Sequence, residues 1–161
     1  MIGRLDDYLR EVSHDNGAAV SEDDIQQAGL AVTKTTAKLQ PRFEKSKGET
    51  GFVCAQVNPA RAGDRDCMQS MARRLNSWAT NIAVKLPATS AGLDVLEDCI
   101  ADGVTVTCTV SFTVPQAVAI AERHRAGIAR AQAKGIEPGK CFAVIMIGRL
   151  DDYLREVAPG T

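Results

Sequence analysis

Four short apolar segments alternate with longer segments along most of the chain. In the longer segments, apolar residues recur at the spacing of one helix face, as Met68, Met71 and Leu75 do. We predict strands at residues 52–57, 82–86, 104–112 and 141–147, with helices at residues 64–79, 90–101, 115–134 and 150–157. Strands that alternate with helices at this spacing form βαβ units, so the sequence predicts an α/β fold built on a parallel sheet.

The residues before the first predicted strand divide into two parts. Residues 1–40 combine a turn-rich loop with a helix predicted over residues 22–39, which begins among acidic residues suited to a helix N-terminus. Residues 41–51 are polar and rich in turn formers, so we interpret them as a linker. A chain of 161 residues can bury one substantial core. We therefore expect a single α/β domain over residues 1–161, in which residues 52–157 supply the βα units.

The third predicted strand has one polar and one apolar face. The apolar face carries Val104, Val106, Cys108, Val110 and Phe112. The polar face carries hydroxyl side chains at the alternate positions Thr105, Thr107, Thr109, Ser111 and Thr113. A parallel sheet covered by helices on both sides should be apolar on both, so this pattern predicts a barrel wall with helices outside and a polar lumen. The alternative is a threonine-rich strand at an exposed sheet edge.

One lysine interrupts the apolar stretch of residues 81–89. Lys85 stands in the middle of this predicted strand, and it shares a face with Ala83 and Thr89. A buried ammonium is costly to desolvate, so such a lysine reaches out to water, pairs with a carboxylate, or loses its proton and becomes an amine nucleophile toward carbonyls. The simpler interpretation is that Lys85 ends an edge strand and points to solvent.

If the polar face is a lumen, several polar side chains converge on Lys85. They lie on or just beyond the carboxyl-terminal halves of their strands, where active sites of barrels are built. The candidate site residues on the strands are Lys85, Gln56, Asn58, Thr89, Thr107, Thr109 and Ser111.

Composition and charge exclude several classes of function. The net charge of −1 gives no electrostatic reason to expect a nucleic-acid or anionic-membrane partner. The five cysteines are scattered and include no C-x-x-C pair, which favours free thiols in a reducing cytoplasm over a zinc site or disulfides. No apolar run is long enough to span a membrane, and the first residues lack the pattern of a signal peptide. We therefore expect a cytoplasmic protein without a bound metal.

The two ends of the chain carry the same sequence. Residues 1–12 and 146–157 both read MIGRLDDYLREV. Solenoid repeats are imperfect and need several copies, so this duplication indicates a recent rearrangement, engineering, or a reading that runs past its own origin. The arginine of each copy, Arg4 and Arg149, could contact an anion. An arginine that neighbours two aspartates, however, is more often part of a surface ion pair.

Three segments together resemble the transaldolase family, including the fructose-6-phosphate aldolases. They are NIAVKLPATSAGL at residues 81–93, GVTVTCTVSFTVPQA at 103–117, and CFAVIMIGRLDDY at 141–153. The resemblance extends over residues 52–157 and implies a partial TIM (β/α)8 barrel, with strands three to six of the family's eight. Residues 13–39 resemble the helix that follows the third segment in the family, so the N-terminal helix is displaced from the C-terminal side, as in a circular permutation.

The resemblance also implies a chemistry and assigns residues to it. Family members cleave and transfer aldol units of sugar phosphates through a lysine Schiff base, without a cofactor. Lys85 matches the Schiff-base lysine, Thr109 the threonine that helps to position the catalytic water, and Arg149 the phosphate-binding arginine. Three positions depart from the family pattern, since a catalytic glutamate is replaced by Gln56, an asparagine by Thr107, and a serine that assists phosphate binding by Val144. A glutamine cannot exchange a proton as a carboxylate does.

Two hypotheses of function follow. The first is an enzyme of carbohydrate metabolism, of the pentose phosphate type, that acts on sugar phosphates through Lys85. The second is a catalytically inactive partial barrel that serves as a structural, self-associating module. A half barrel leaves two open sheet edges, so under both hypotheses we expect a homo-oligomer that completes the barrel.

Overall fold

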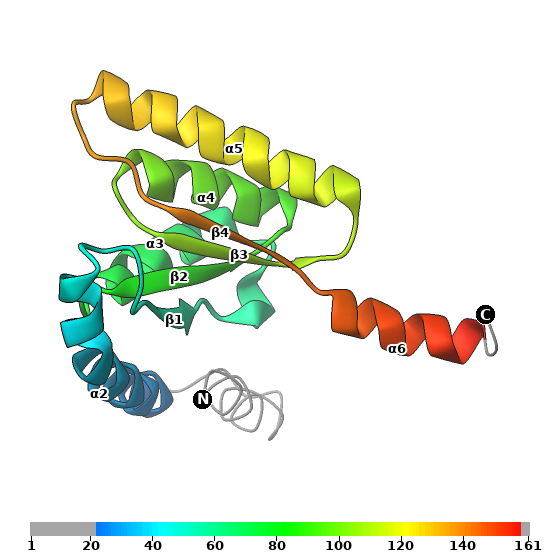
Figure 1. The fold of residues 1–161 in the computed structure, drawn as a ribbon, viewed down its shortest axis with the longest axis horizontal. Helices are drawn as coiled ribbons and strands as arrows, with labels where there is room; N and C mark the ends of the chain where they lie inside the picture. Colours follow the sequence, from blue (N-terminus) through cyan, green and yellow to red (C-terminus); the bar gives the residue numbers. More distant parts are fainter. Residues whose placement is uncertain (1–21, 159–161) are drawn as a thin grey trace. The chain divides into compact units, whose positions relative to one another are not determined.

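The computed structural model of the protein describes residues 22–158, and the side chains of all of these except residues 22–28, 149 and 150. Its four strands form one parallel sheet in the order β1-β2-β3-β4 (Figure 1). This confirms the predicted α/β fold of a partial barrel. The strands are β1 (Val53–Gln56), β2 (Ile82–Pro87), β3 (Val106–Ser111) and β4 (Cys141–Ile145). The helices are α2 (Glu22–Lys45), η1 (Pro59–Arg61), α3 (Arg65–Asn76), α4 (Ser90–Ala101), α5 (Val114–Ala133) and α6 (Ile147–Val157).

The described residues divide into two compact units. The first holds residues 22–55 and 77–82, and the second holds residues 56–76 and 83–158. Each unit has its own packing.

In the first unit, α2 continues to Lys45, well past the end predicted at residue 39. Residues 41–45 of the predicted linker are therefore helical, although Pro41 removes one hydrogen bond inside the helix. One contact secures this extension, and a second holds the helix just before it. The ring of Phe43 packs edge-to-face on that of Phe52, with centroids 5.1 Å apart. The buried Asn81 amide donates to the carbonyl oxygen of Thr36, at 3.0 Å.

In the second unit, α4 and α5 lie side by side over one face of the sheet, and α3 packs beside α4 (Figure 1). The strands bury Val84, Leu86, Val106 and Cys108 fully on this face. These residues alternate with Lys85 and Thr107, so the apolar face predicted from the sequence is the face that the helices cover. The opposite face carries the polar side chains.

The end of the second unit leaves apolar side chains exposed. Strand β4 pairs with β3 and forms an edge of the sheet. Phe142 and Ile145 on this strand are 39% and 41% exposed. Helix α6 extends away from the sheet and exposes Ile147 and Tyr153 (Figure 1). No helix within residues 22–158 has the length and apolar character needed to cross a membrane.

Candidate functional site

A row of side chains crosses the polar face of the sheet at Lys85. The register of β2 and β3 sets Lys85 opposite Thr107, and the register of β3 and β4 sets Thr107 opposite Phe142. The amide nitrogen of Val57 donates to the carbonyl oxygen of Lys85, at 3.3 Å. In a parallel ladder this bond places Gln56 opposite Lys85. Gln56, Lys85 and Thr107 therefore lie in one row, on the polar face that the alternation of the sequence predicted.

A second row lies nearer the carboxyl ends of the strands. Pro87 is opposite Thr109, and the amide of Ala88 donates to the carbonyl oxygen of Thr109, at 2.7 Å. Thr109 is only 7% exposed, and it is two residues beyond Thr107 on the same face. The geometry thus brings Thr109 to the strand that carries Lys85, at the end where barrel enzymes bind substrate.

Two predicted site residues use their side chains to hold the local fold. Asn58 follows β1, and its side-chain oxygen accepts from the amide of Ala60 at 2.9 Å, which caps η1. Thr89 caps α4, because its hydroxyl oxygen accepts from the amide of Gly92 at 3.0 Å and donates to the carbonyl oxygen of Ala62 at 2.8 Å. These bonds fix the loops at the carboxyl ends of β1 and β2.

The predicted alternation along β3 is wrong at Ser111, because a β-bulge interrupts it. Cys108 lies opposite Ala143, whereas Ser111 lies opposite Ile145, so three steps along β3 match two steps along β4. The extra residue puts Ser111 in phase with Cys108, away from the polar face. Ser111 is fully buried there. Val110 adopts a positive φ of 59°, which is rare for a β-branched residue.

The side chain of Gln116 binds the backbone of this bulge. The sequence analysis did not identify Gln116 as a site residue. Its Nε2 donates to the carbonyl oxygen of Val110 at 3.3 Å, and its Oε1 accepts from the amides of Phe112 and Thr113, at 2.9 and 3.2 Å. Thr113 and Gln116 also form a capping box at the start of α5. A threonine followed three residues later by a glutamine is the sequence signal that could have found this arrangement.

The thiols of β3 and β4 are poor nucleophiles. Burial raises the pKa of the Cys108 thiol to about 12 and that of Cys141 to about 11. Both side chains therefore remain protonated at neutral pH. Among the side chains that the structure describes, no cluster of three or more histidine, cysteine, aspartate or glutamate residues could hold a metal ion. Arg4 lies outside the described residues, and Arg149 belongs to α6 without a described side chain.

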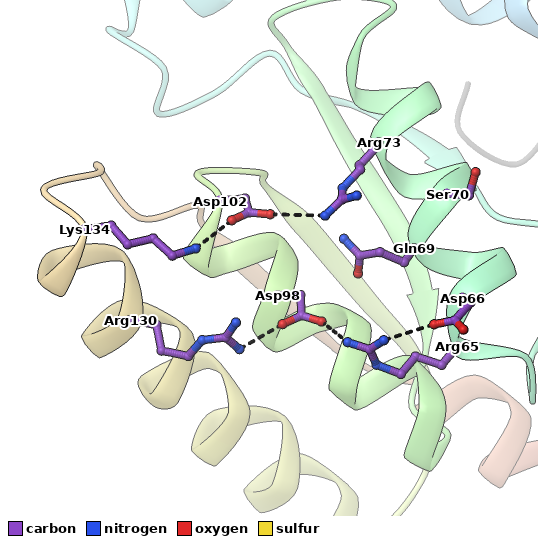
Figure 2. Close-up of a pocket in the computed structure, with 9 residues that line it drawn as sticks. All are labelled: Arg65, Asp66, Gln69, Ser70, Arg73, Asp98, Asp102, Arg130 and Lys134. Atoms are coloured by element: carbon purple, nitrogen blue, oxygen red, sulfur yellow. Dashed lines mark hydrogen bonds and ion pairs between the residues drawn. The ribbon is translucent and has the colours of Figure 1, made fainter.

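A separate hollow of about 560 Å³ lies on the helical side of the second unit (Figure 2). Asp98 on α4 bridges Arg65 on α3 and Arg130 on α5, and one turn further along α4 Asp102 pairs with Lys134 at 2.9 Å. These ion pairs connect three neighbouring helices. None of the residues that line this hollow belongs to the rows around Lys85, so the candidate catalytic site remains on the polar face of the sheet.

The carboxylate of Glu97 on α4 is stabilised in its charged form. Hydrogen bonding from Arg123 lowers the pKa of Glu97, and Arg130 adds to the effect against the opposing cost of burial. Glu97 accepts from Arg123 and Arg130, each at 2.9 Å. The network therefore ties α4 to α5 at neutral pH, beneath the sheet that presents Lys85.

Comparison with known proteins identifies one family. The model of the family described as transaldolase/fructose-6-phosphate aldolase matches residues 3–160. The chain is 34% identical to a transaldolase of Neisseria gonorrhoeae over 120 residues, which are 72% of this chain and 34% of that protein. It is 33% identical to a transaldolase of Neisseria meningitidis serogroup A over 156 residues, which are 90% of this chain and 44% of the relative.

A transaldolase of Mycolicibacterium paratuberculosis is 30% identical over 138 residues, which cover 82% of this chain and 35% of that protein. The chain thus spans less than half the length of these curated relatives. The matched length accords with a sheet of four strands, since a complete barrel has eight.

Proposed function

Because the chain belongs to the transaldolase/fructose-6-phosphate aldolase family, we propose that it catalyses aldol cleavage and transfer on sugar phosphates through a Schiff base at Lys85. The observation that carries this proposal is the row of Gln56, Lys85 and Thr107 on the polar face of the sheet, with Thr109 in the next row. An amine at this place can meet a ketose that enters from the carboxyl ends of the strands.

The reaction would begin with addition of the Lys85 amine to the ketose carbonyl. Loss of water gives an iminium ion, which draws electrons from the adjacent carbon–carbon bond. That bond breaks as the neighbouring hydroxyl gives up its proton, an aldehyde leaves, and the electron pair remains as an enamine on Lys85. The enamine then adds to an acceptor aldehyde or takes up a proton, and water releases the product and restores the amine.

The other residues would bind the sugar phosphate and the catalytic water and orient them toward Lys85. Thr109 would hold the water that adds to the iminium carbon, and Arg149 would pair with the phosphate group of the sugar, as the family resemblance implies. Thr107 is opposite Lys85, so it would contact the ketose carbons nearest the amine. Asn58 and Thr89 would shape the rim through the loops that they cap. The electron sink is the imine itself, so this chemistry requires no cofactor.

The test is trapping of the imine in the intact protein. Incubation with fructose 6-phosphate or dihydroxyacetone and borohydride should add one reduced adduct, found by intact-mass spectrometry and mapped to Lys85 in the digest. Lys85→Ala should lose the adduct completely, whereas Lys38→Ala, at an exposed lysine of α2, should keep it. An adduct that persists in Lys85→Ala, or none in the unaltered protein, would contradict the proposal. The second outcome would favour a partial barrel with a purely structural role.

A homo-oligomer would complete the barrel and support either role. Strands β1 and β4 are the two edges of a wholly parallel sheet, so β4 of one copy can pair in parallel with β1 of another. Phe142 and Ile145 would then be covered. We expect a dimer or larger assembly by size-exclusion chromatography with light scattering. Ile145→Glu should shift it toward monomer, while Ile136→Glu, at an exposed residue beyond α5, should not. A monodisperse monomer at high concentration would overturn this expectation.

A further inference from the structure

The bulge in β3 places a β-branched residue, Val110, in a left-handed backbone conformation that is unfavourable for L-residues. A positive φ places the Cβ of an L-residue close to the following carbonyl oxygen, a penalty equal to about a tenfold shift in an equilibrium. Val110 carries this conformation with a branched side chain, and that side chain is 48% exposed. A glycine would adopt the same backbone freely. Conformations of this kind persist where surrounding contacts fix them, and they concentrate at functional sites.

The contacts that fix Val110 come from the amide of Gln116. Its Nε2 binds the carbonyl oxygen of Val110, and its Oε1 accepts from two backbone amides and from the hydroxyl of Thr113, at 3.1 Å. This pattern uses both ends of the amide and determines its orientation. One side chain of α5 therefore binds the backbone on both sides of Ser111.

The bulge gives the two sides of β3 different registers. On the side of β2, the carbonyl oxygen of Thr109 accepts from Ala88, so Thr109 remains aligned with the strand of Lys85. On the side of β4, the carbonyl oxygen of Ser111 accepts from the amide of Met146 at 3.0 Å. The additional residue, Val110, takes up the mismatch between these registers. Thr109 is thus the last residue of β3 that keeps the alignment of the polar face.

We propose that Gln116 is a positioning residue, which holds the left-handed backbone of Val110 and thereby sets Thr109 beside the strand that carries Lys85. This inference rests on the proposed function, in which Thr109 orients the water that releases product from the imine. The Gln116 amide binds backbone groups of Val110, Phe112 and Thr113, so its effect on Thr109 passes through the backbone. Loss of its amide should slow hydrolysis of the imine and leave formation of the imine unchanged.

Gln116→Met removes the amide and keeps the length of the side chain. We expect hydrogen exchange at the Ala88 amide, measured by NMR, to accelerate about tenfold, as loss of a net hydrogen bond would allow. We also expect hydrolysis of the preformed Lys85 imine to slow by about tenfold at an unchanged rate of imine formation. Gln132→Met, at an exposed glutamine on the same helix, should change none of these rates.

Val110→Gly supplies the decisive comparison. If Gln116 acts by holding a strained backbone, glycine at position 110 relieves the strain and should restore exchange and hydrolysis in the Gln116→Met background. A loss that arises only from poorer packing would not be restored by removing a further side chain. Failure of Val110→Gly to restore either rate, or unchanged exchange at Ala88 in Gln116→Met, would overturn the proposal.

Failure of the proposed chemistry and failure of the role of Gln116 give different results in these experiments. If the unaltered protein forms no imine, the proposed chemistry fails and with it the role of Gln116 in catalysis, whereas the exchange rates still decide whether Gln116 holds the bulge. Should Gln116→Met not fold, Gln116→Glu replaces it, because its carboxylate still accepts from Phe112 and Thr113 but cannot donate to Val110 at neutral pH. It should then show the same acceleration at Ala88.

Discussion

Gln56→Glu is expected to raise the rate of aldol cleavage by about 100-fold or more, which is the range that a well-placed general acid–base contributes. Gln56 lies opposite Lys85 in the ladder of β1 and β2, so a carboxylate there would lie next to the amine that forms the imine. It could give a proton to the departing water and take one from the hydroxyl at the cleaved bond. The amide of Gln56 can do neither. The measurement is kcat for aldehyde release from fructose 6-phosphate.

Two comparisons make this prediction specific to proton transfer. Gln56→Leu is close in size but has no proton to exchange, so it should not exceed the rate of the unaltered protein. The yield of borohydride-trapped adduct at Lys85 should be measured for all three proteins, because it reports imine formation apart from turnover. Equal kcat values for Gln56→Glu and Gln56→Leu, at equal adduct yields, would show that position 56 takes no part in proton transfer.

Gly92→Ala is expected to lower the free energy of unfolding by about 3 kcal/mol, as overpacking against a rigid backbone does. A Cβ at position 92 would lie 2.0 Å from the carbonyl oxygen of Pro87 and 3.1 Å from the Thr89 hydroxyl oxygen. The first atom belongs to the backbone of β2, so α4 would have to move away from the sheet. The Thr89 cap that bonds the Gly92 amide would be lost in that movement. Urea unfolding followed by circular dichroism measures the change.

The matched control is Gly63→Ala. No heavy atom lies within 4 Å of the position that its Cβ would take, so the change should stay within about 0.5 kcal/mol. Gly92→Ala should also reduce adduct formation at Lys85, because the displaced Pro87 belongs to the same strand. Equal stabilities of the two variants would mean that α4 can shift without cost.

The repeating pattern of the chain was sufficient to predict the fold. Apolar segments of strand length that alternate with helical segments determined four βα units, and the positions of the predicted strands agree with β1 to β4. The polar and apolar faces of β3 were also correct as far as Thr109. These features depend on the period of the side chains, two for a strand and 3.6 for a helix, and the sequence displays such periods directly.

Sequence periodicity is less informative wherever a single residue departs from its period. The helix predicted to end at residue 39 runs through Pro41 to Lys45, where the ring of Phe43 packs on that of Phe52 within the folded unit. Intrinsic propensity is a weak guide once tertiary contacts of this kind contribute. Thr89 belonged to the predicted polar face, and the structure shows that its hydroxyl also caps α4.

By itself, the sequence determined that this protein has alternating strands and helices with one polar sheet face, on which Lys85, Gln56 and Thr107 fall in phase. Only the tertiary structure decided that these residues form one row across neighbouring strands, since register depends on hydrogen bonds between distant segments. It also decided that Ser111 leaves the polar face. The bulge at Val110 adds one residue to β3 relative to β4, and the Gln116 amide that holds it becomes a partner only when α5 begins beside the end of that strand.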